Sequence, residues 1–164
     1  LDVPSTAVGI AAGDLVINGT GINASSATDD TASTNGADRS AISKAAAINE
    51  FSDTTGVVAD VNTNTAAGTA QTATATNGAI TLNNVRIDVT TGGVDEAADR
   101  ASVLQAINAV SGQTGITAVD TGDSATGINL VADDGRNIDL IYNKFDENGD
   151  TYANGVTASA TGSL

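Results

Sequence analysis

The sequence contains no cysteine, no histidine and no tryptophan. Without cysteine the chain has no disulfide, no thiolate metal site and no thiol nucleophile. Without histidine it lacks the commonest general base and the commonest transition-metal ligand. A zinc protease site built on an H-E-x-x-H motif is therefore impossible in this chain. We expect a protein that is not an enzyme and has no catalytic residues, no bound cofactor and no metal.

Aromatic residues and positive charges are also scarce. Only 2 % of the 164 residues are aromatic, so the apolar residues are mainly Ala, Val, Ile and Leu, which form small aliphatic cores. Six Lys and Arg residues stand against twenty Asp and Glu residues, a formal net charge of −14. Such a charge repels phosphate groups, which argues against nucleic-acid binding. No apolar run approaches the roughly 20 residues needed to cross a bilayer, and we expect no membrane partner.

One pattern occurs twice in the chain. Ala-Ile-Asn, two residues, Ser, two residues, Thr, Gly and an aliphatic residue begin at Ala47 and begin again at Ala106 with identical spacing. An Asp-Arg step precedes both copies. Because a repeated pattern is the signature of a repeated structural unit, the sequence predicts two tandem similar modules. We place the first module at residues 1–77 and the second at residues 78–164.

The first module is expected to contain a hairpin, one helix and further strands. Asn18-Gly19 is a strong signal for a tight hairpin turn. An amphipathic helix is predicted over residues 37–51, with Asp38 as its N-cap. Strands are predicted over residues 57–61 and 69–76. The residues expected on the buried face of the helix are Ile42, Ala45, Ala46, Ile48 and Phe51.

The second module repeats this order. A hairpin signal at Asn77-Gly78 is followed by a predicted hairpin over residues 79–89, with its turn at Asn83-Asn84. A helix is predicted over residues 96–110, with Ala97, Ala101, Leu104, Ile107 and either Val103 or Val110 buried. Three more strands are predicted at 116–119, 127–132 and 138–142, and a further one is considered around 152–160. The sequence thus predicts an α+β fold in which each module lays one amphipathic helix on a small antiparallel sheet.

The repeated segments resemble a known family. The strings SAISKAAAIN (residues 40–49) with DTTGV (53–57), and AINAVSGQTGI (106–116) with ADDGRNI (132–138), are similar to the module repeated in the variable outer region of bacterial flagellins. The similarity covers about two-thirds of the chain, between residues 14 and 142. The strings are fairly specific when they occur together, whereas either one alone would be a weak signal.

This resemblance implies a structural role in the outer, variable and antigenic region of the bacterial flagellar filament, with an extracellular location. The partners it implies are other flagellin subunits, contacted through terminal helical segments that the sequence does not contain, and neighbouring outer domains. We therefore expect the chain to be part of a longer, exported protein. The alternative is an extracellular binding module, adhesin-like or carbohydrate-binding, in which the loop 24–36 contacts the ligand.

Two groups of acidic residues are candidate sites. The first half of a Ca²⁺-binding loop is matched by Asp146, Asn148 and Asp150, with Tyr152 at the backbone-carbonyl position. Thr151 stands where that loop requires Gly, and Thr157 stands where it requires a bidentate carboxylate. We therefore favour a solvated acidic turn over a calcium site at residues 146–152. Another turn, 133–137, contains two adjacent Asp residues and an Arg. A turn with a local ion pair is favoured there over an acid–base pair.

The remaining candidates are amides and hydroxyl groups. Asn49 and Asn108 follow the apolar helix positions in both copies, and we interpret them as structural groups that satisfy the main chain near the helix end rather than as ligand-binding groups. The resemblance also implies possible O-linked glycans on the exposed loop. The candidate acceptors are Ser25, Ser26, Thr28, Thr31, Ser33 and Thr34.

Overall fold

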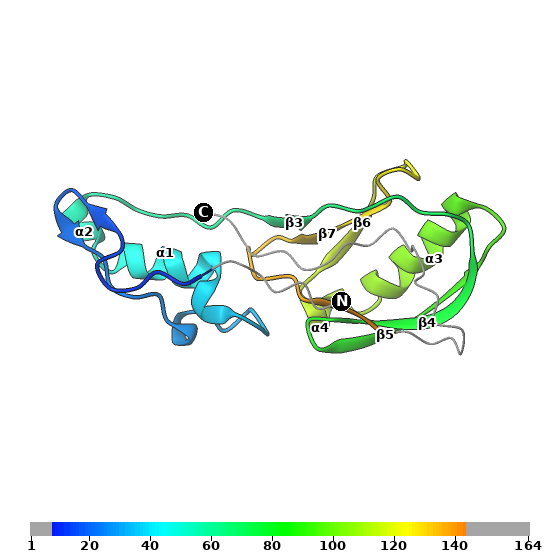
Figure 1. Cartoon of the computed structure of the whole chain (residues 1–164), viewed down its shortest axis with the longest axis horizontal. Helices are drawn as coiled ribbons and strands as arrows, with labels where there is room; N and C mark the ends of the chain where they lie inside the picture. The colour runs from blue at the N-terminus through cyan, green and yellow to red at the C-terminus, as the bar shows by residue number, and fades with distance from the viewer. Residues whose placement is uncertain (1–7, 144–164) are drawn as a thin grey trace. The chain divides into compact units, whose positions relative to one another are not determined.

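The computed structural model describes residues 8–143, and its fold is α+β as predicted (Figure 1). The helices are α1 (Ala41–Asn49), α2 (Ser52–Thr55), α3 (Glu96–Asn108) and α4 (Ser111–Thr114), with short 3₁₀ helices η1 (Ala27–Asp29) and η2 (Ala37–Arg39). The strands are β1 (Val16–Ile17), β2 (Thr20–Gly21), β3 (Asn64–Ala66), β4 (Ala75–Leu82), β5 (Val85–Gly92), β6 (Thr117–Asp120), β7 (Ile128–Ala132) and β8 (Leu140–Asn143).

The described residues form two compact units, which we name after their main helices. The α1 unit comprises residues 8–64 together with Ala132–Asn137, and the α3 unit comprises Thr65–Val131 together with residues 138–143. Each unit is thus built from two separate stretches of chain. The module border expected between residues 77 and 78 lies inside β4.

A long antiparallel hairpin is the main sheet of the α3 unit. β4 pairs along its whole length with β5, from Ala75 opposite Gly92 to Leu82 opposite Val85, and β8 pairs with the other side of β4. The turn residues Asn83 and Asn84 have φ values of 46° and 66°, the left-handed conformation that a type I′ hairpin turn requires and that Asn tolerates. The predicted hairpin at 79–89 is confirmed and extends further at both ends.

The second hairpin signal, at Asn77-Gly78, was wrong. These residues continue β4 and lie opposite Thr90 and Val89 of β5. Asn-Gly favours a turn only where the chain can reverse, and here the flanking residues are already paired in a continuous ladder. The eight residue pairs of the hairpin outweigh the local preference of one dipeptide.

Helix α3 packs against β5 and β6, and its buried face differs from the prediction. The residues that the helix buries are Asp99, Arg100, Val103 and Ile107. Ala97 and Ala101, expected in the core, are exposed. The prediction followed hydrophobicity, whereas the first two turns of the helix bury charged side chains that have specific hydrogen-bond partners.

A second small sheet has the strand order β3-β7-β6. β6 and β7 are antiparallel, with Ala118 opposite Leu130. The inward residues Ile128, Leu130 and Ala132 are fully buried, which is the alternation expected of a half-buried strand. The strands predicted at 116–119 and 127–132 are confirmed, and β8 confirms most of the strand predicted at 138–142.

The α1 unit has a short hairpin and one helix. Strands β1 and β2 pair across Asn18-Gly19, as predicted. The predicted helix 37–51 is shorter, because η2 precedes α1 and a separate turn of helix, α2, follows it. Its N-cap is Ser40 and not Asp38, since the Ser40 hydroxyl accepts the main-chain N–H of Ser43 at 3.1 Å. The core of this unit is a small cluster around Ile22, Ala47 and Ile48.

Two predicted strands are largely missing. Residues 57–61 are extended but belong to no strand among the described residues, although the equivalent segment of the second copy is β6. Residues 69–74 contain only an isolated bridge at Gln71, and the last two predicted positions belong to β4. Both segments have strand-like sequences, but a strand also needs a neighbour. The strand considered around 152–160 lies outside the described residues.

We predict that Ile107→Ala destabilises the α3 unit by about 2 to 5 kcal/mol, because Ile107 is completely buried and its truncation leaves a cavity. Ala101→Gly is the control on the exposed face of the same helix and should cost about 1 kcal/mol, through helix propensity alone. Urea unfolding followed by circular dichroism measures both. Equal losses for the two variants would contradict the observed helix orientation.

Candidate functional site

The repeated sequence folds into the same local structure twice. In each copy a helix ends at an Asn, a single turn of helix follows, and a Gly in the left-handed conformation ends that turn. Gly56 has φ 70° and ψ 12°, and Gly115 has φ 71° and ψ 15°. A left-handed residue at this position favours Gly because a Cβ atom would be strained there. The spacing of the sequence repeat therefore encodes a helix, a single further turn of helix and a left-handed glycine that ends it.

The two asparagines hold the next extended segment against the helix end. The Asn108 amide nitrogen donates to the Ala118 carbonyl at 3.0 Å, and its oxygen accepts the Ala118 N–H at 2.8 Å. Asn49 makes the same two hydrogen bonds to Ala59, at 2.9 and 2.7 Å. One amide thus satisfies both main-chain groups of a residue ten positions later. We call this pair of hydrogen bonds the asparagine bracket, and it confirms the structural interpretation of Asn49 and Asn108.

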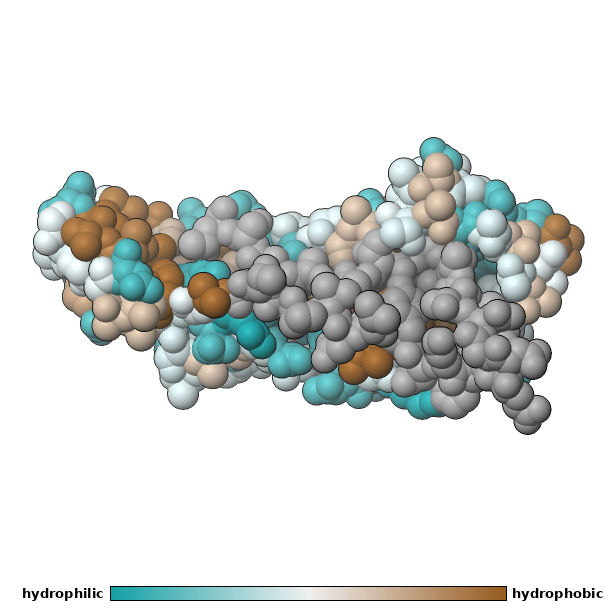
Figure 2. Space-filling view, viewed as in Figure 1, coloured by the Kyte–Doolittle hydropathy of each residue, from teal (hydrophilic) through white to brown (hydrophobic). Residues whose placement is uncertain are grey.

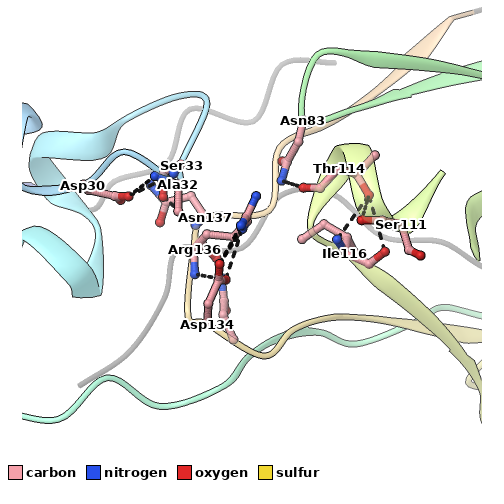
Figure 3. A network of polar contacts seen from close by, with 11 residues as sticks. Asp30, Ala32, Ser33, Asn83, Ser111, Thr114, Ile116, Asp134, Arg136 and Asn137 are labelled. Atoms are coloured by element: carbon pink, nitrogen blue, oxygen red, sulfur yellow. Dashed lines mark hydrogen bonds and ion pairs between the residues drawn. The ribbon is translucent and has the colours of Figure 1, made fainter.

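A second asparagine contacts each copy from the preceding hairpin. Asn18, with φ 50°, donates from its side chain to the Thr55 carbonyl at 2.7 Å. Asn83, with φ 46°, donates to the Thr114 carbonyl at 3.0 Å (Figure 3). Asn serves both needs at this position, since it tolerates a positive φ and carries an amide donor. The sequence signals predict both turns, but they do not predict the long-range contact made by the first residue of each turn.

Asp99 ties helix α3 to the loop that precedes it. One carboxylate oxygen accepts the N–H groups of Gly92 and Gly93 at 3.1 and 3.0 Å, and the other accepts the N–H of Thr74 at 3.0 Å. The side chain is buried, with 2 % of the residue exposed. A buried carboxylate is stable when several main-chain N–H groups surround it. This one joins the start of β4 to the end of β5, at the open end of the hairpin.

The buried Arg100 side chain forms an ion pair with the exposed Asp120 at the end of β6. Its Nε lies 2.8 Å from Oδ1 of Asp120, and Nη1 donates to the Ser124 hydroxyl at 3.2 Å. The pKa of Asp120 is lowered, and the largest cause is the hydrogen bond from the Gly122 N–H. Burial, the next largest cause, raises the pKa, whereas the hydrogen bond and the charge of Arg100 lower it further. The Asp-Arg step before the first copy has no such role, because Asp38-Arg39 lies in η2, outside the helix.

The acidic turn 133–137 belongs to the α1 unit and contains the predicted ion pair. Nη2 of Arg136 lies 2.6 Å from Oδ2 of Asp134, and Nε donates to the same oxygen at 2.8 Å. The turn reverses at Gly135, which has φ 75°. A Cβ atom on Gly135 would lie only 2.1 Å from the side chain of Val61. Asp133 is exposed. The arrangement is a turn with an internal ion pair, as favoured from the sequence.

Asn137 fastens this turn to the serine- and threonine-rich loop of the same unit. Its side chain donates to the carbonyls of Asn35 and Gly36, both at 3.0 Å. Its own N–H donates to the hydroxyl of Ser33 at 2.8 Å, and Figure 3 shows Asn137 close to Ser33. More than 100 positions separate these residues in the sequence. No local pattern relates the two segments, so this contact is not predictable from the sequence.

Asp30 is the most deeply buried carboxylate of the α1 unit, with 3 % exposed. Its Oδ1 accepts the N–H groups of Ala32 and Ser33 at 2.8 and 2.9 Å. Burial alone raises the pKa of Asp30, but the hydroxyl groups of Ser33 and Ser40 and these N–H groups outweigh it, and the net pKa is lowered. Oδ2 has no hydrogen-bond partner in the described part of the chain.

The predicted glycan acceptors fall into two groups. The hydroxyls of Ser25 and Ser33 are half-buried and hold the main chain, since Ser25 accepts the Ile10 N–H and donates to the Asp38 carbonyl. Ser26 caps η1 and shares a hydrogen bond with the Thr28 hydroxyl. Thr28, Thr31 and Thr34 are exposed. Steric access therefore favours the three threonines over the three serines.

The possible calcium loop at 146–152 lies outside the described residues. Among residues 8–143, no three acidic side chains come close enough to hold a metal ion. Within the same range, no helix combines the length and the hydropathy needed to cross a bilayer. A scan against protein-family models and a search of curated proteins each found no match to this chain.

We predict that Asn108→Ala lowers the free energy of unfolding by about 1 to 3 kcal/mol, because it leaves both main-chain groups of Ala118 without their partner. Asn49→Ala should have a similar effect in the α1 unit. Asn62→Ala is the control, since Asn62 is exposed. Urea unfolding gives the three values, and a control loss as large as that of Asn108→Ala would contradict the bracket's role.

We predict that the protein loses stability in acid. The pKa values of Asp30, Asp120 and Asp134 are all lowered in the folded state. Their contribution is therefore complete above their unfolded pKa of about 3.9 and disappears as the pH falls through the folded values. The melting temperature should be nearly constant from pH 7 to about pH 5 and fall below about pH 4.

The variant Asp30→Asn should reduce the difference between the melting temperatures at pH 7 and pH 3, because the side chain at this position can no longer take up a proton. Asp29→Asn, at the exposed neighbouring position, is the control and should change this difference less. Differential scanning calorimetry measures both. An unchanged pH dependence in Asp30→Asn would contradict the assigned shift.

Proposed function

We propose that this chain is a non-enzymatic structural module, part of the variable outer region of a bacterial flagellin. The observation that carries the proposal is the double Ala-Ile-Asn pattern, at identical spacing and with identical asparagine brackets. The repeat encodes a structural element and not a ligand-binding group, and a repeated structural element is what a surface-building module requires.

The use of the buried polar groups supports a structural role. Asp99 accepts three main-chain N–H groups, Asn108 holds both main-chain groups of Ala118, and Asn137 spans two carbonyls. Side chains saturated in this way are unsuited to bind a substrate. Their contribution is to order loops around small aliphatic cores.

Charge and core size are compatible with the same role. A net charge of −14 keeps densely packed copies apart and an assembled surface soluble. Small cores without disulfides give modest stability, which suits a chain that must unfold to pass through a narrow export channel. In this proposal the chain lies outside the cell, on the filament surface, where the exposed threonines are accessible to glycosylation.

Immunogold electron microscopy tests the proposal. Antibodies raised against the chain should label the flagellar filaments of the bacterium that encodes it, along their whole length. Deletion of the gene segment that encodes residues 8–143 of this chain should abolish the label while filaments still form, because the proposal places this segment outside the filament core. Label confined to the cell body, or deletion mutants without filaments, would contradict it.

A glycan array with the whole chain addresses the adhesin-like alternative. Saturable binding to one class of glycan, lost when the exposed part of loop 24–36 is replaced by a Gly/Ser segment, would favour a binding module. The flagellin proposal expects no such binding.

A further inference from the structure

The two copies of the repeat differ in what lies beside the segment after the asparagine bracket. In the second copy this segment is β6, which pairs with β7. In the first copy the equivalent residues, 57–60, run as an extended trace between α2 and β3, with no paired strand among the described residues (Figure 1). The copies align through Asn49 with Asn108 and through Gly56 with Gly115. The second copy therefore shows what kind of neighbour the first one lacks.

The main chain of this segment points the right way to accept a strand. In the second copy the N–H and C=O of Ala118 face Asn108, so those of its neighbours Thr117 and Val119 face β7. In the first copy Ala59 faces Asn49 in the same way. By the same alternation, the N–H and C=O groups of Val58 and Asp60 face away from the bracket. Within residues 8–143 these groups have no hydrogen-bond partner.

The open edge carries exposed apolar side chains. Val57 is 37 % exposed, whereas its equivalent Ile116 is completely buried, and Val58 is 68 % exposed. Val16 of β1 is exposed as well. Ala59 of the edge packs, together with the partly buried Leu15, Ile17 and Phe51, against the core cluster of the unit. Figure 2 shows hydrophobic residues gathered at the end of the α1 unit that carries β1 and α2. An exposed apolar patch next to unpaired strand groups is typical of an interaction surface.

We infer that residues 57–60 are an acceptor edge for a β-strand from a partner protein, which adds to the α1 unit as β7 adds to β6. The incoming strand pairs antiparallel with Val58 and Asp60, and its inward side chains are aliphatic, as Ile128, Leu130 and Ala132 are in β7. This is strand addition, in which main-chain hydrogen bonds give affinity and alternate side chains give specificity.

Charge selects the partner. Asp60 lies on the edge itself and Asp53 lies in the preceding α2. Because opposite charges directly across a strand pair stabilise it and like charges destabilise it, a basic residue facing Asp60 is favoured. A second copy of this acidic chain fits poorly, since its net charge of −14 opposes close approach. The occupant is therefore an alternating aliphatic strand with Lys or Arg opposite Asp60. This inference does not depend on the flagellin proposal.

The probe is a synthetic peptide with the β7 sequence Ile-Asn-Leu-Val-Ala, in which Lys replaces the Asn. In the β6–β7 register this position faces Val119, the equivalent of Asp60. Binding to the whole chain is followed by fluorescence anisotropy, and amide hydrogen exchange by NMR locates it. We expect saturable binding that slows exchange at the amides of Val58 and Asp60. A peptide with Glu in place of Lys should bind about three- to tenfold more weakly.

Two kinds of variant make the test specific. N-methylation of the peptide at its second and fourth residues blocks the N–H groups that face the edge, and binding should weaken at least about tenfold, whereas methylation of the third should have a much smaller effect. Asp60→Lys should reverse the preference between the Lys and Glu peptides. Asp29→Lys, an equal charge change in η1, should leave the preference unchanged.

Three results would overturn the inference. The first is no binding of the Lys peptide at millimolar concentration. The second is protection that maps elsewhere in the chain. The third is protection of Val58 and Asp60 that grows with protein concentration in the absence of peptide, which would assign the edge to a second copy.

Discussion

The asparagine bracket is the interaction on which the rest of the structure depends. One side-chain amide satisfies the N–H and the C=O of the same residue, ten positions later, and so fixes the distance and direction between a helix end and the following segment. The left-handed Gly56 and Gly115 allow the chain to reverse between each helix end and the segment that follows it. Each helix thereby has an extended segment in a defined position that does not depend on pairing in a sheet.

The same bracket leads to two different outcomes. In the α3 unit the bracketed segment gains β7 as a neighbour and becomes β6, and aliphatic side chains from both strands enter the core. In the α1 unit the bracketed segment has no strand beside it in the described residues, and Val57 and Val58 remain exposed. The bracket is therefore sufficient to position a segment but not to make it a strand, since a strand needs a second set of hydrogen-bonding groups.

Buried polar side chains supply much of the tertiary order in a chain with few large apolar residues. Asp99 ties a hairpin to its helix, Arg100 ties that helix to β6, and Asn137 ties the acidic turn to a distant loop. Each contact is directional and joins segments that a small aliphatic core could not align on its own. The cost is that every such group must keep its partners, because an unpaired buried polar group destabilises the fold.

The sequence alone determined the α+β class, both tight hairpin turns, the two helices, most strands of the α3 unit and the structural role of Asn49 and Asn108. These follow from local patterns, namely periodicity, turn residues and a repeat at fixed spacing. Only the tertiary structure decided that Asn77-Gly78 continues a strand, that residues 57–61 do not form one, and that helix α3 buries Asp99 and Arg100 instead of Ala97 and Ala101. The physical reason is the same in each case. Whether a segment pairs or a charge is buried depends on hydrogen-bonding groups supplied by residues far away in the chain. The local sequence does not indicate which distant groups will be available.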